Sequence, residues 1–337
     1  MITLRSKTSL LVLLLMTAIW ATGLYGCASN DKPGESDEER LALYSDLALQ
    51  YYNMGDLDRA QGQAEQGLAI DEDCDKLALI LGWIHQRRGK LADIQRAEAI
   101  FRSLQDGGDY RARLGLAEAL ERKGLALDEA SVAVADGSRF TSATDPQARA
   151  HELASSATAA WAESLTEYDA TLELQPGNWD ALNGSMRVCS LLARPADSLL
   201  WARRLLDTTE IEATFWRRQL ERGDLSAPDE RRFRKLMQSA ADLQVATHMH
   251  AAATLKALGR TAQALEHMDR VVEMTPDLRE AWSRHAQLLM AQGDFSEAQQ
   301  SLDQFLRRSP DFDDPAVRQA YSLLSECEAA ITAAAPR

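Results

Sequence analysis

The stretch AWSRHAQLLMAQGDFSEAQQSLDQFLRRSP, residues 281–310, predicts two short helices joined by a tight turn. Gly293 stands where the first helix must end, because glycine adopts the left-handed backbone of a helix C-cap without steric cost. Pro310 follows the second helix and blocks its continuation. Ala286 and Ala298 lie 12 residues apart, one on each segment, so the two helices can pack closely. The stretch is therefore interpreted as a helical hairpin.

The same pattern recurs along the chain. The stretch ALYSDLALQYYNMGDLDRAQGQAEQGLAID, residues 42–71, has the same layout. Turn glycines and stop prolines recur 34 residues apart in the pairs Gly55/Gly89, Gly259/Gly293 and Pro276/Pro310. Small residues 12 apart recur in the pairs Ala48/Ala60, Gly184/Ala196, Ala252/Ala264 and Ala286/Ala298. A fixed period of this length is typical of stacked helix–turn–helix units.

These stretches resemble the tetratricopeptide repeat (TPR) family. The residues that carry the resemblance occupy the large, small, turn and stop positions of the family motif: Trp282, Ala286, Leu289, Gly293, Phe295, Ala298, Leu302 and Pro310. The resemblance implies an all-α, right-handed solenoid of about seven helix pairs with a C-terminal capping helix. The pairs are expected to start near Leu41, Asp75, Gly108, Gly177, Thr209, Val245 and Arg279.

Laying this frame along the chain predicts its organisation. We expect a signal peptide at 1–26, a lipidated cysteine and acidic tether at 27–38, and TPR repeats at 39–124. An insert and a long helix follow at 125–176, divergent TPR-like repeats at 177–242, C-terminal repeats at 243–312 and a capping helix at 313–330. Residues 125–144 interrupt the third pair, and within them the stretch VAVADGSRFTSAT, residues 132–144, is interpreted as a loop. Asp145 and Pro146 then cap and open a helix that meets no breaker before Pro176.

The first 27 residues predict export and membrane attachment. Arg5 and Lys7 precede an apolar core too short for a membrane-spanning helix. Residues 24–27, LYGC, resemble the bacterial lipobox, which implies a diacylglycerol on the Cys27 thiol and cleavage after Gly26. Ala28 follows the cysteine and implies the outer membrane, facing the periplasm. The alternatives are an ordinary cleaved signal peptide and an uncleaved anchor.

Composition narrows the class of protein. Aromatic residues make up only 6% of the chain and alanine is abundant, which favours helices. Without Arg5 and Lys7 the chain keeps 35 basic against 51 acidic side chains, which moves the net charge from −14 to −16. That sign argues against non-specific binding of nucleic acid or anionic lipid. The other three cysteines, Cys74, Cys189 and Cys327, are widely spaced and do not form a disulfide framework.

No sequence motif points to catalysis, a cofactor or a metal ion. His248 and His250 lie two residues apart and point to different sides of a helix, so they should not chelate a metal together. The remaining histidines are interpreted as surface or packing residues. One rival hypothesis is an envelope enzyme with a site in residues 125–174, where the reactive side chains are Ser138, Arg139, His151 and Glu152.

The resemblance implies that partners bind the inner surface formed by the first helix of each pair. The inner positions are Tyr52, Asn53, Trp83, Gln86, Arg87, Arg217, Met249, Lys256, Gln287 and Met290. For Trp83 and the methionines, packing between repeats is the alternative. The TPR clamp for chaperone carboxylates does not fit, because its cationic and amide positions are occupied by Ser45, Leu49, Leu79 and Trp83.

We therefore expect a lipid-anchored TPR scaffold or adaptor that binds another envelope protein. Assembly of a pilus, a secretin or a cell-wall enzyme complex would each suit such a protein, and the sequence leaves that choice open. A structural spacer without a specific partner is a third hypothesis.

Overall fold

In the computed structural model, residues 36–138, 143, 145–309 and 313–334 are described, and their regular structure is entirely helical. These residues form thirteen α-helices, α2–α14, and one turn of 3-10 helix, without a strand. The predicted all-α fold class of helix–turn–helix solenoid is thereby confirmed. The predicted signal peptide, Cys27, Arg139 and Pro310 lie outside the described residues.

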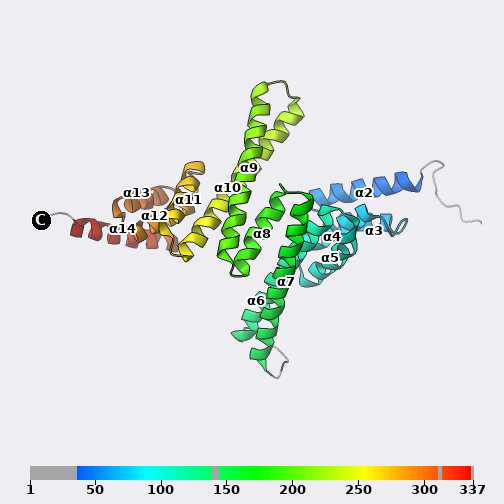
Figure 1. Cartoon of the computed structure of the whole chain (residues 1–337), viewed down its shortest axis with the longest axis horizontal. Coiled ribbons are helices and arrows are strands. Elements are labelled where there is room, and N and C mark those ends of the chain that lie inside the picture. The colour runs from blue at the N-terminus through cyan, green and yellow to red at the C-terminus, as the bar shows by residue number, and fades with distance from the viewer. Residues whose placement is uncertain (1–35, 139–142, 144, 310–312, 335–337) are drawn as a thin grey trace, which may run out of the picture. The chain divides into compact units, whose positions relative to one another are not determined.

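The chain divides into two compact units, one ending at Ile80 and the other starting at Leu81. The first unit contains α2 (Asp37–Met54), α3 (Leu57–Leu68) and the first residues of α4 (Asp75–Arg88). The second contains the rest of α4 and then α5 (Leu91–Leu104), η1 (Gln105–Gly107), α6 (Tyr110–Ala135), α7 (Pro146–Leu174), α8 (Trp179–Leu191), α9 (Pro195–Arg222), α10 (Ala227–Ala257), α11 (Thr261–Met274), α12 (Arg279–Gln292), α13 (Phe295–Arg307) and α14 (Pro315–Ala334) (Figure 1).

The hairpin of the first unit has the expected local chemistry. Ser36 caps α2 in a reciprocal capping box with Glu39, which satisfies two free backbone N–H groups at the helix start. Gly55 ends the helix with φ +82° in the left-handed region. Ala48 and Ala60 are fully buried between α2 and α3, so the predicted close approach of small residues is confirmed here. Helix α2 begins at Asp37, so the end of the predicted tether is already helical.

In the second unit, glycines on one helix receive aromatic rings from another. A Cβ added at Gly184 on α8 would lie 2.1 Å from Cζ of Tyr168 on α7, and one added at Gly82 would lie 2.6 Å from Phe101. The predicted pairing of Gly184 with Ala196 is wrong, because Ala196 is exposed on the first turn of α9. The space above Gly184 is instead filled by the fully buried ring of Tyr168.

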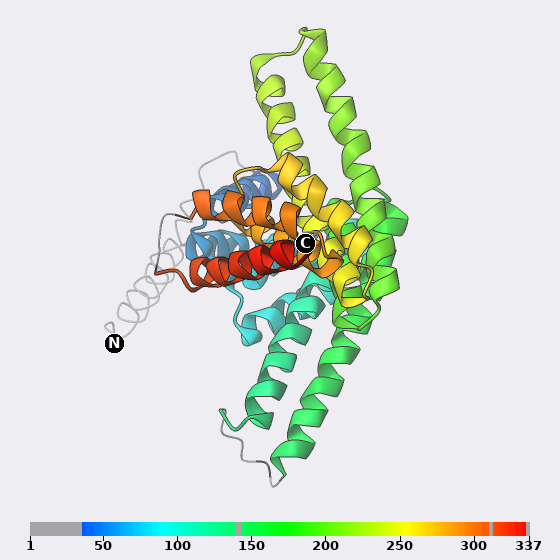
Figure 2. The same cartoon turned by 90° about the vertical axis from the view of Figure 1, so that its left-hand side faces the viewer.

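Helices α6 and α7 form a long hairpin (Figure 2). The long helix after Asp145 is confirmed: α7 has 29 residues, and the Asp145 side chain accepts hydrogen bonds from the N–H groups of Gln147 and Ala148. The loop predicted for residues 132–144 is partly wrong, because α6 continues to Ala135. Val134 is buried in this last turn, which explains why it stays helical.

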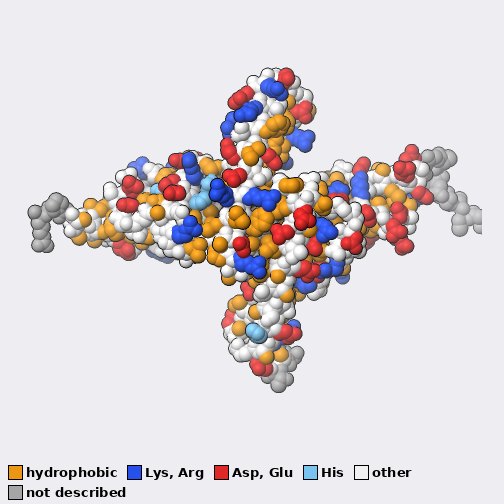
Figure 3. All heavy atoms as spheres, in the orientation of Figure 1, with side chains coloured by type: hydrophobic (Ala, Val, Ile, Leu, Met, Phe, Trp, Pro, Cys, Tyr) orange, Lys and Arg blue, Asp and Glu red, His pale blue; other side chains and the backbone are white. Residues whose placement is uncertain are grey.

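Helices α9 and α10, of 28 and 31 residues, form a second long hairpin. Its outer part, residues 209–222 of α9 and 227–242 of α10, is called the arm below. The separate helix pair predicted to start at Thr209 is wrong. Thr209 lies inside α9 with its hydroxyl donating to the Leu205 carbonyl at 2.9 Å, and no helix breaker separates it from Pro195. Figure 3 shows orange hydrophobic side chains among blue and red ones on the arm, at the top of the view.

The last helices follow the predicted frame, whereas the pair predicted to start near Val245 does not begin there, because α10 runs unbroken from Ala227 to Ala257. Helix α12 begins at Arg279 as expected and ends at Gly293, whose φ is +90°. Ala286 and Ala298 are fully buried between α12 and α13. Val317, Ala320 and Cys327 of α14 pack in one hydrophobic cluster with Ala286 and Ala298. This packing agrees with a helix that covers the last hairpin.

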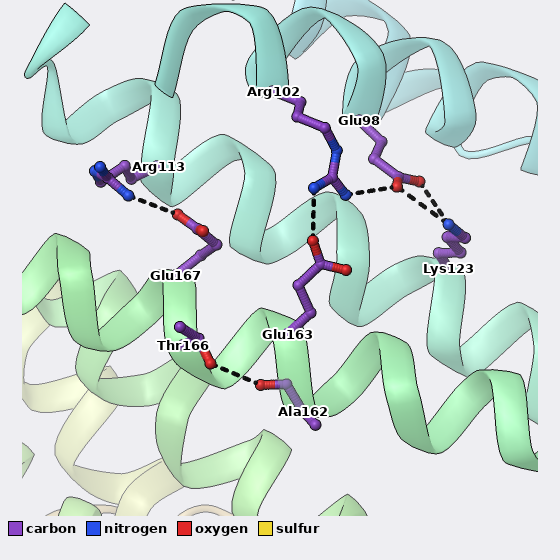
Figure 4. Close-up of polar contacts among 8 residues, drawn as sticks. All are labelled: Glu98, Arg102, Arg113, Lys123, Ala162, Glu163, Thr166 and Glu167. Carbon is purple, nitrogen blue, oxygen red and sulfur yellow. Dashed lines mark hydrogen bonds and ion pairs between the residues drawn. The ribbon is translucent and has the colours of Figure 1, made fainter. Parts of the chain in front are cut away.

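Ion pairs connect α5, α6 and α7 at their surfaces (Figure 4). Arg102 on α5 contacts Glu98 at 3.0 Å and Glu163 on α7 at 2.6 Å. Lys123 on α6 contacts Glu98 at 2.9 Å, so Glu98 joins two cations from different helices. Such partly exposed pairs contribute little individually, but a network fixes how neighbouring helices align.

Among the described residues, no helix is long and apolar enough to cross a bilayer.

Candidate functional site

A groove lies along the C-terminal part of α10, which packs against α11, and along α12, which packs against α13. Its volume is about 300 Å³. Helix α10 contributes Met249, Ala252, Ala253 and Lys256, helix α11 contributes Met268, and helix α12 contributes Arg284, Gln287 and Leu288. Residues three and four apart share one face of a helix, so two parallel rows of side chains form the walls.

The floor of the groove belongs to the protein core. Ala252, Met268 and Leu288 are each only 2% exposed and pack in one hydrophobic cluster with Ala264. Ala252 is the small residue of the floor and leaves room above it, while Met249 is partly buried at the side of the groove. A groove of this kind can accept an apolar side chain, because methionine is flexible and adapts to the shape of a bound group.

The rim of the groove carries positive charge. Lys256 and Arg284 are exposed, and the lining residues include no carboxylate. The Lys256 ammonium lies 3.5 Å from the side-chain oxygen of Gln287, which connects the two walls. In a chain of net charge −14, two cations beside an apolar floor favour a ligand that combines a carboxylate with an apolar group.

Three of the ten predicted inner-face residues line this groove: Met249, Lys256 and Gln287. Met290 lies one turn further along α12 and packs in the next core cluster. Arg217 lies on the arm and is exposed there, because α9 continues past Thr209. Arg284 also lines the groove but was not among the predicted inner positions, although it stands three residues before Gln287 on the same helix face.

The predicted residues of α4 are mostly packed. The Trp83 ring contacts Phe101 edge-on with centroids 5.1 Å apart. Gln86 is 2% exposed, and its side-chain amide donates to Glu118 on α6 at 2.5 Å. Arg87 is exposed. The partly buried Trp83 thus packs between helices, and its role in partner binding stays a prediction. In the first unit, Tyr52 is half-buried and Asn53 is exposed.

Glu118 lies on α6, within hydrogen-bond distance of the Gln86 side chain. Burial, together with the nearby Asp180 carboxylate, raises the pKa of Glu118 to about 7, while the hydrogen bond from Gln86 opposes the shift. Its neighbour Glu121 is buried but fully partnered. It accepts from the Tyr168 hydroxyl at 2.7 Å and from the Arg187 guanidinium at 2.8 Å, so it holds α6, α7 and α8 together.

Two histidines of α10 make contacts that the sequence analysis missed. Nδ1 of His248 lies 2.8 Å from Nδ1 of His267 on α11, and burial lowers the pKa of His248 to about 4. Nε2 of His250 lies within hydrogen-bond distance of the Ser190 and Ser198 hydroxyls. The described residues contain no group of three or more potential metal ligands. The sequence signal for these contacts was weak, because each of these partners is at least 19 residues away along the chain.

The residues of the rival enzyme hypothesis are not assembled in the described part of the chain. The Glu152 carboxylate pairs with Arg149 on the same helix at 2.6 Å. Ser138 donates its hydroxyl to the Ala133 carbonyl, and its N–H to Asp136. His151 is exposed on the first turns of α7.

Comparison with known proteins agrees with the helical-repeat class. Residues 255–324, which contain the second half of the groove, match the family described as tetratricopeptide repeat. The match identifies a tetratricopeptide repeat segment at residues 255–324, and the described part of the chain is an all-helical solenoid. None of the curated proteins compared with the chain matches its sequence.

Solved structures with similar architecture include a thermophilic TPR protein of Thermus thermophilus. It is 15% identical, with 76% of this chain and 100% of that chain covered and a TM-score of 0.41. The MamA protein is 10% identical over 80% and 92% of the two chains, with a TM-score of 0.37. PilF of Pseudomonas aeruginosa is 12% identical over 88% and 93%, with a TM-score of 0.34. Similarities of this size say nothing about what the chain binds.

Proposed function

We propose that this protein is a membrane-anchored scaffold of the bacterial envelope that binds a segment of another protein in the α10–α12 groove. The observation that carries the proposal is the groove itself: an apolar floor bordered by Lys256 and Arg284 and lined without a carboxylate. Its second half, from Lys256 to Leu288, lies within the segment that matches the tetratricopeptide repeat family. TPR-type grooves present side chains of first helices to extended or helical peptides, which suits a scaffold.

The partner segment should carry a bulky apolar side chain next to a carboxylate. The apolar group would bury against Met249 and Leu288, which supplies most of the affinity. The carboxylate would lie near Lys256 and Arg284 at the rim, where exposed charges set orientation and association rate more than affinity. Pilus, secretin and cell-wall assemblies all remain candidates for the complex that contains this partner.

The groove can be tested by charge reversal. Lys256→Glu with Arg284→Glu should reduce partner capture at least tenfold, because the rim would repel the carboxylate that it now attracts. Both side chains are exposed, so helicity and thermal unfolding should stay close to those of the wild type. The measurement is quantitative capture of envelope proteins by the full-length chain.

The matched control reverses Arg270 and Arg307, which are exposed on the second helices α11 and α13. This variant has the same change in net charge and should capture partners normally. If the control loses capture while the groove variant keeps it, the groove is not the binding surface.

Membrane attachment rests on the LYGC sequence that precedes Ala28. We expect Cys27→Ser to leave an unprocessed precursor without a thioether-linked lipid, because the thiol is the group that is acylated. Mass spectrometry of the N-terminal peptide is the measurement. A wild-type protein that is processed normally and carries no lipid would contradict the anchor but leave the groove untouched.

A further inference from the structure

The arm carries an uncovered stripe of side chains along α9. Ile211 is 70% exposed and Phe215 is 53% exposed, although both are large apolar residues. They lie in a shallow hollow of about 540 Å³ on this helix face. The hollow is lined by Glu210, Ile211, Thr214, Phe215, Arg218, Gln219 and Arg222. Their spacing of three and four residues places them on one side of the helix.

The arm does not need this stripe for its own stability. Its inner side has a separate core in which Trp216 and Ala213 of α9 pack against Ala240 of α10, with Phe233 and Met237 partly buried beside them. The two helices of the arm are therefore held together through the opposite face of α9. Exposed apolar residues that the local core does not use indicate a contact surface.

The charges along the stripe follow a fixed order. Asp207 and Glu210 precede the apolar pair, and Arg218 and Arg222 follow it. Asp207 is exposed, and its ion pair to Arg203 is long at 4.0 Å. The Glu210 carboxylate accepts long hydrogen bonds from Thr214 at 3.3 Å and from Gln244 at 3.4 Å. The stripe therefore has an acidic end, an apolar middle and a basic end.

We propose that this stripe binds the same stripe of a second copy of the chain in antiparallel orientation. With Thr214 opposite Thr214 of the second copy, Glu210 faces Arg218, and Asp207 lies one position from Arg222. Ile211 and Phe215 of both copies then meet in the middle. A parallel arrangement would place like charges against each other, so the charge order selects the antiparallel, two-fold arrangement.

The contact is small, and this sets the strength of the dimer. One helix face of about four turns on each copy lies at the lower end of what specific interfaces bury. The ion pairs at its ends are exposed, so salt weakens them. The whole chain carries a charge of −14, so two copies repel each other away from the stripe. The stripe therefore forms a dimer that depends on protein concentration and on salt.

A charge-swap experiment tests the pairing directly. The full-length chain is studied in a neutral detergent by gel filtration with light scattering. One variant, Arg218→Glu with Arg222→Glu, has an acidic stripe throughout; the other, Asp207→Arg with Glu210→Arg, has a basic one. Each alone should dimerise at least tenfold more weakly than the wild type, whereas an equimolar mixture should form a one-to-one heterodimer.

The control is Arg231→Glu with Arg232→Glu. It changes the net charge by the same amount as the Arg218→Glu, Arg222→Glu variant, but at exposed positions of α10 in the same arm. It should dimerise as the wild type does, and Phe215→Ser should not. The proposal is overturned if the wild type stays monomeric up to about 100 μM at low salt. It is equally overturned if the two charge variants fail to associate when mixed, or if the α10 control loses the dimer.

Discussion

At the scale of single residues, the packing of this protein depends on glycines that receive aromatic rings. Gly184 accepts Tyr168, and Gly124 accepts Trp161, whose ring nitrogen would lie 2.3 Å from an added Cβ. The rule of small residues 12 apart identified Gly184 but gave it the wrong partner. That rule considers only the two helices of one pair, whereas Tyr168 comes from the preceding helix α7.

Gly184→Ala should destabilise the second unit by about 1–3 kcal/mol, because the added methyl group overlaps a buried ring that has no free space to move into. Chemical denaturation followed by circular dichroism measures this loss. Gly62→Ala is the contrasting substitution, since nothing lies within 4 Å of its added Cβ in helix α3. It should be neutral or stabilise by up to about 1 kcal/mol. Equal effects of the two substitutions would contradict the packing described for Gly184.

Glu118 should make stability depend on pH. Its folded pKa of about 7 is above the ordinary value of 4.5, so between these values the folded state holds a proton that the unfolded state releases. This contribution is complete below about pH 4.5 and is lost as the pH rises through 7. Glu118→Gln keeps an acceptor for Gln86 and should remove this dependence, which makes it about 1–3 kcal/mol more stable than wild type at pH 8.

Urea denaturation of both proteins between pH 5 and pH 8 measures the effect. The two stability curves should converge toward pH 5. A constant difference across the whole range would mean that Glu118 does not titrate there.

At the scale of elements, helix ends were predictable and helix lengths were less so. Gly55, Gly293 and Asp145 act through local backbone chemistry, so they identify ends without reference to the rest of the fold. The errors at Thr209 and at residues 132–135 have the opposite origin. Both regions lack a breaker, and their burial comes from partner helices, so a fixed period could not show that the helices continue.

Ala298→Glu should melt the C-terminal hairpins before the rest of the second unit. Ala298 is fully buried against α12, so the substitution both overpacks the helix crossing and buries a charge. In a stack of nearest-neighbour interfaces the damage stays mainly local. Hydrogen exchange should therefore quicken in α12, α13 and α14, while α6 to α8 keep their protection. Unchanged exchange in α13 would contradict the assigned helix crossing.

At the scale of the whole molecule, the sequence located part of the candidate site. Met249, Lys256 and Gln287 were identified because the 34-residue period places them on first helices, and they line one groove. Trp83, Gln86 and Met290 satisfy the same period but are packed against other residues. Periodicity assigns a helix face, but only the neighbouring hairpins decide whether that face is covered.

The central claim is that the α10–α12 groove binds a partner segment. The most direct measurement is site-specific photo-crosslinking of the full-length protein in its native envelope, with the reactive group at Gln287 in the groove or at Arg307 on α13. The groove position should give a discrete crosslinked partner that disappears in the Lys256→Glu, Arg284→Glu background, and the outer position should give none. A discrete partner at Arg307 with none at Gln287 would contradict the account.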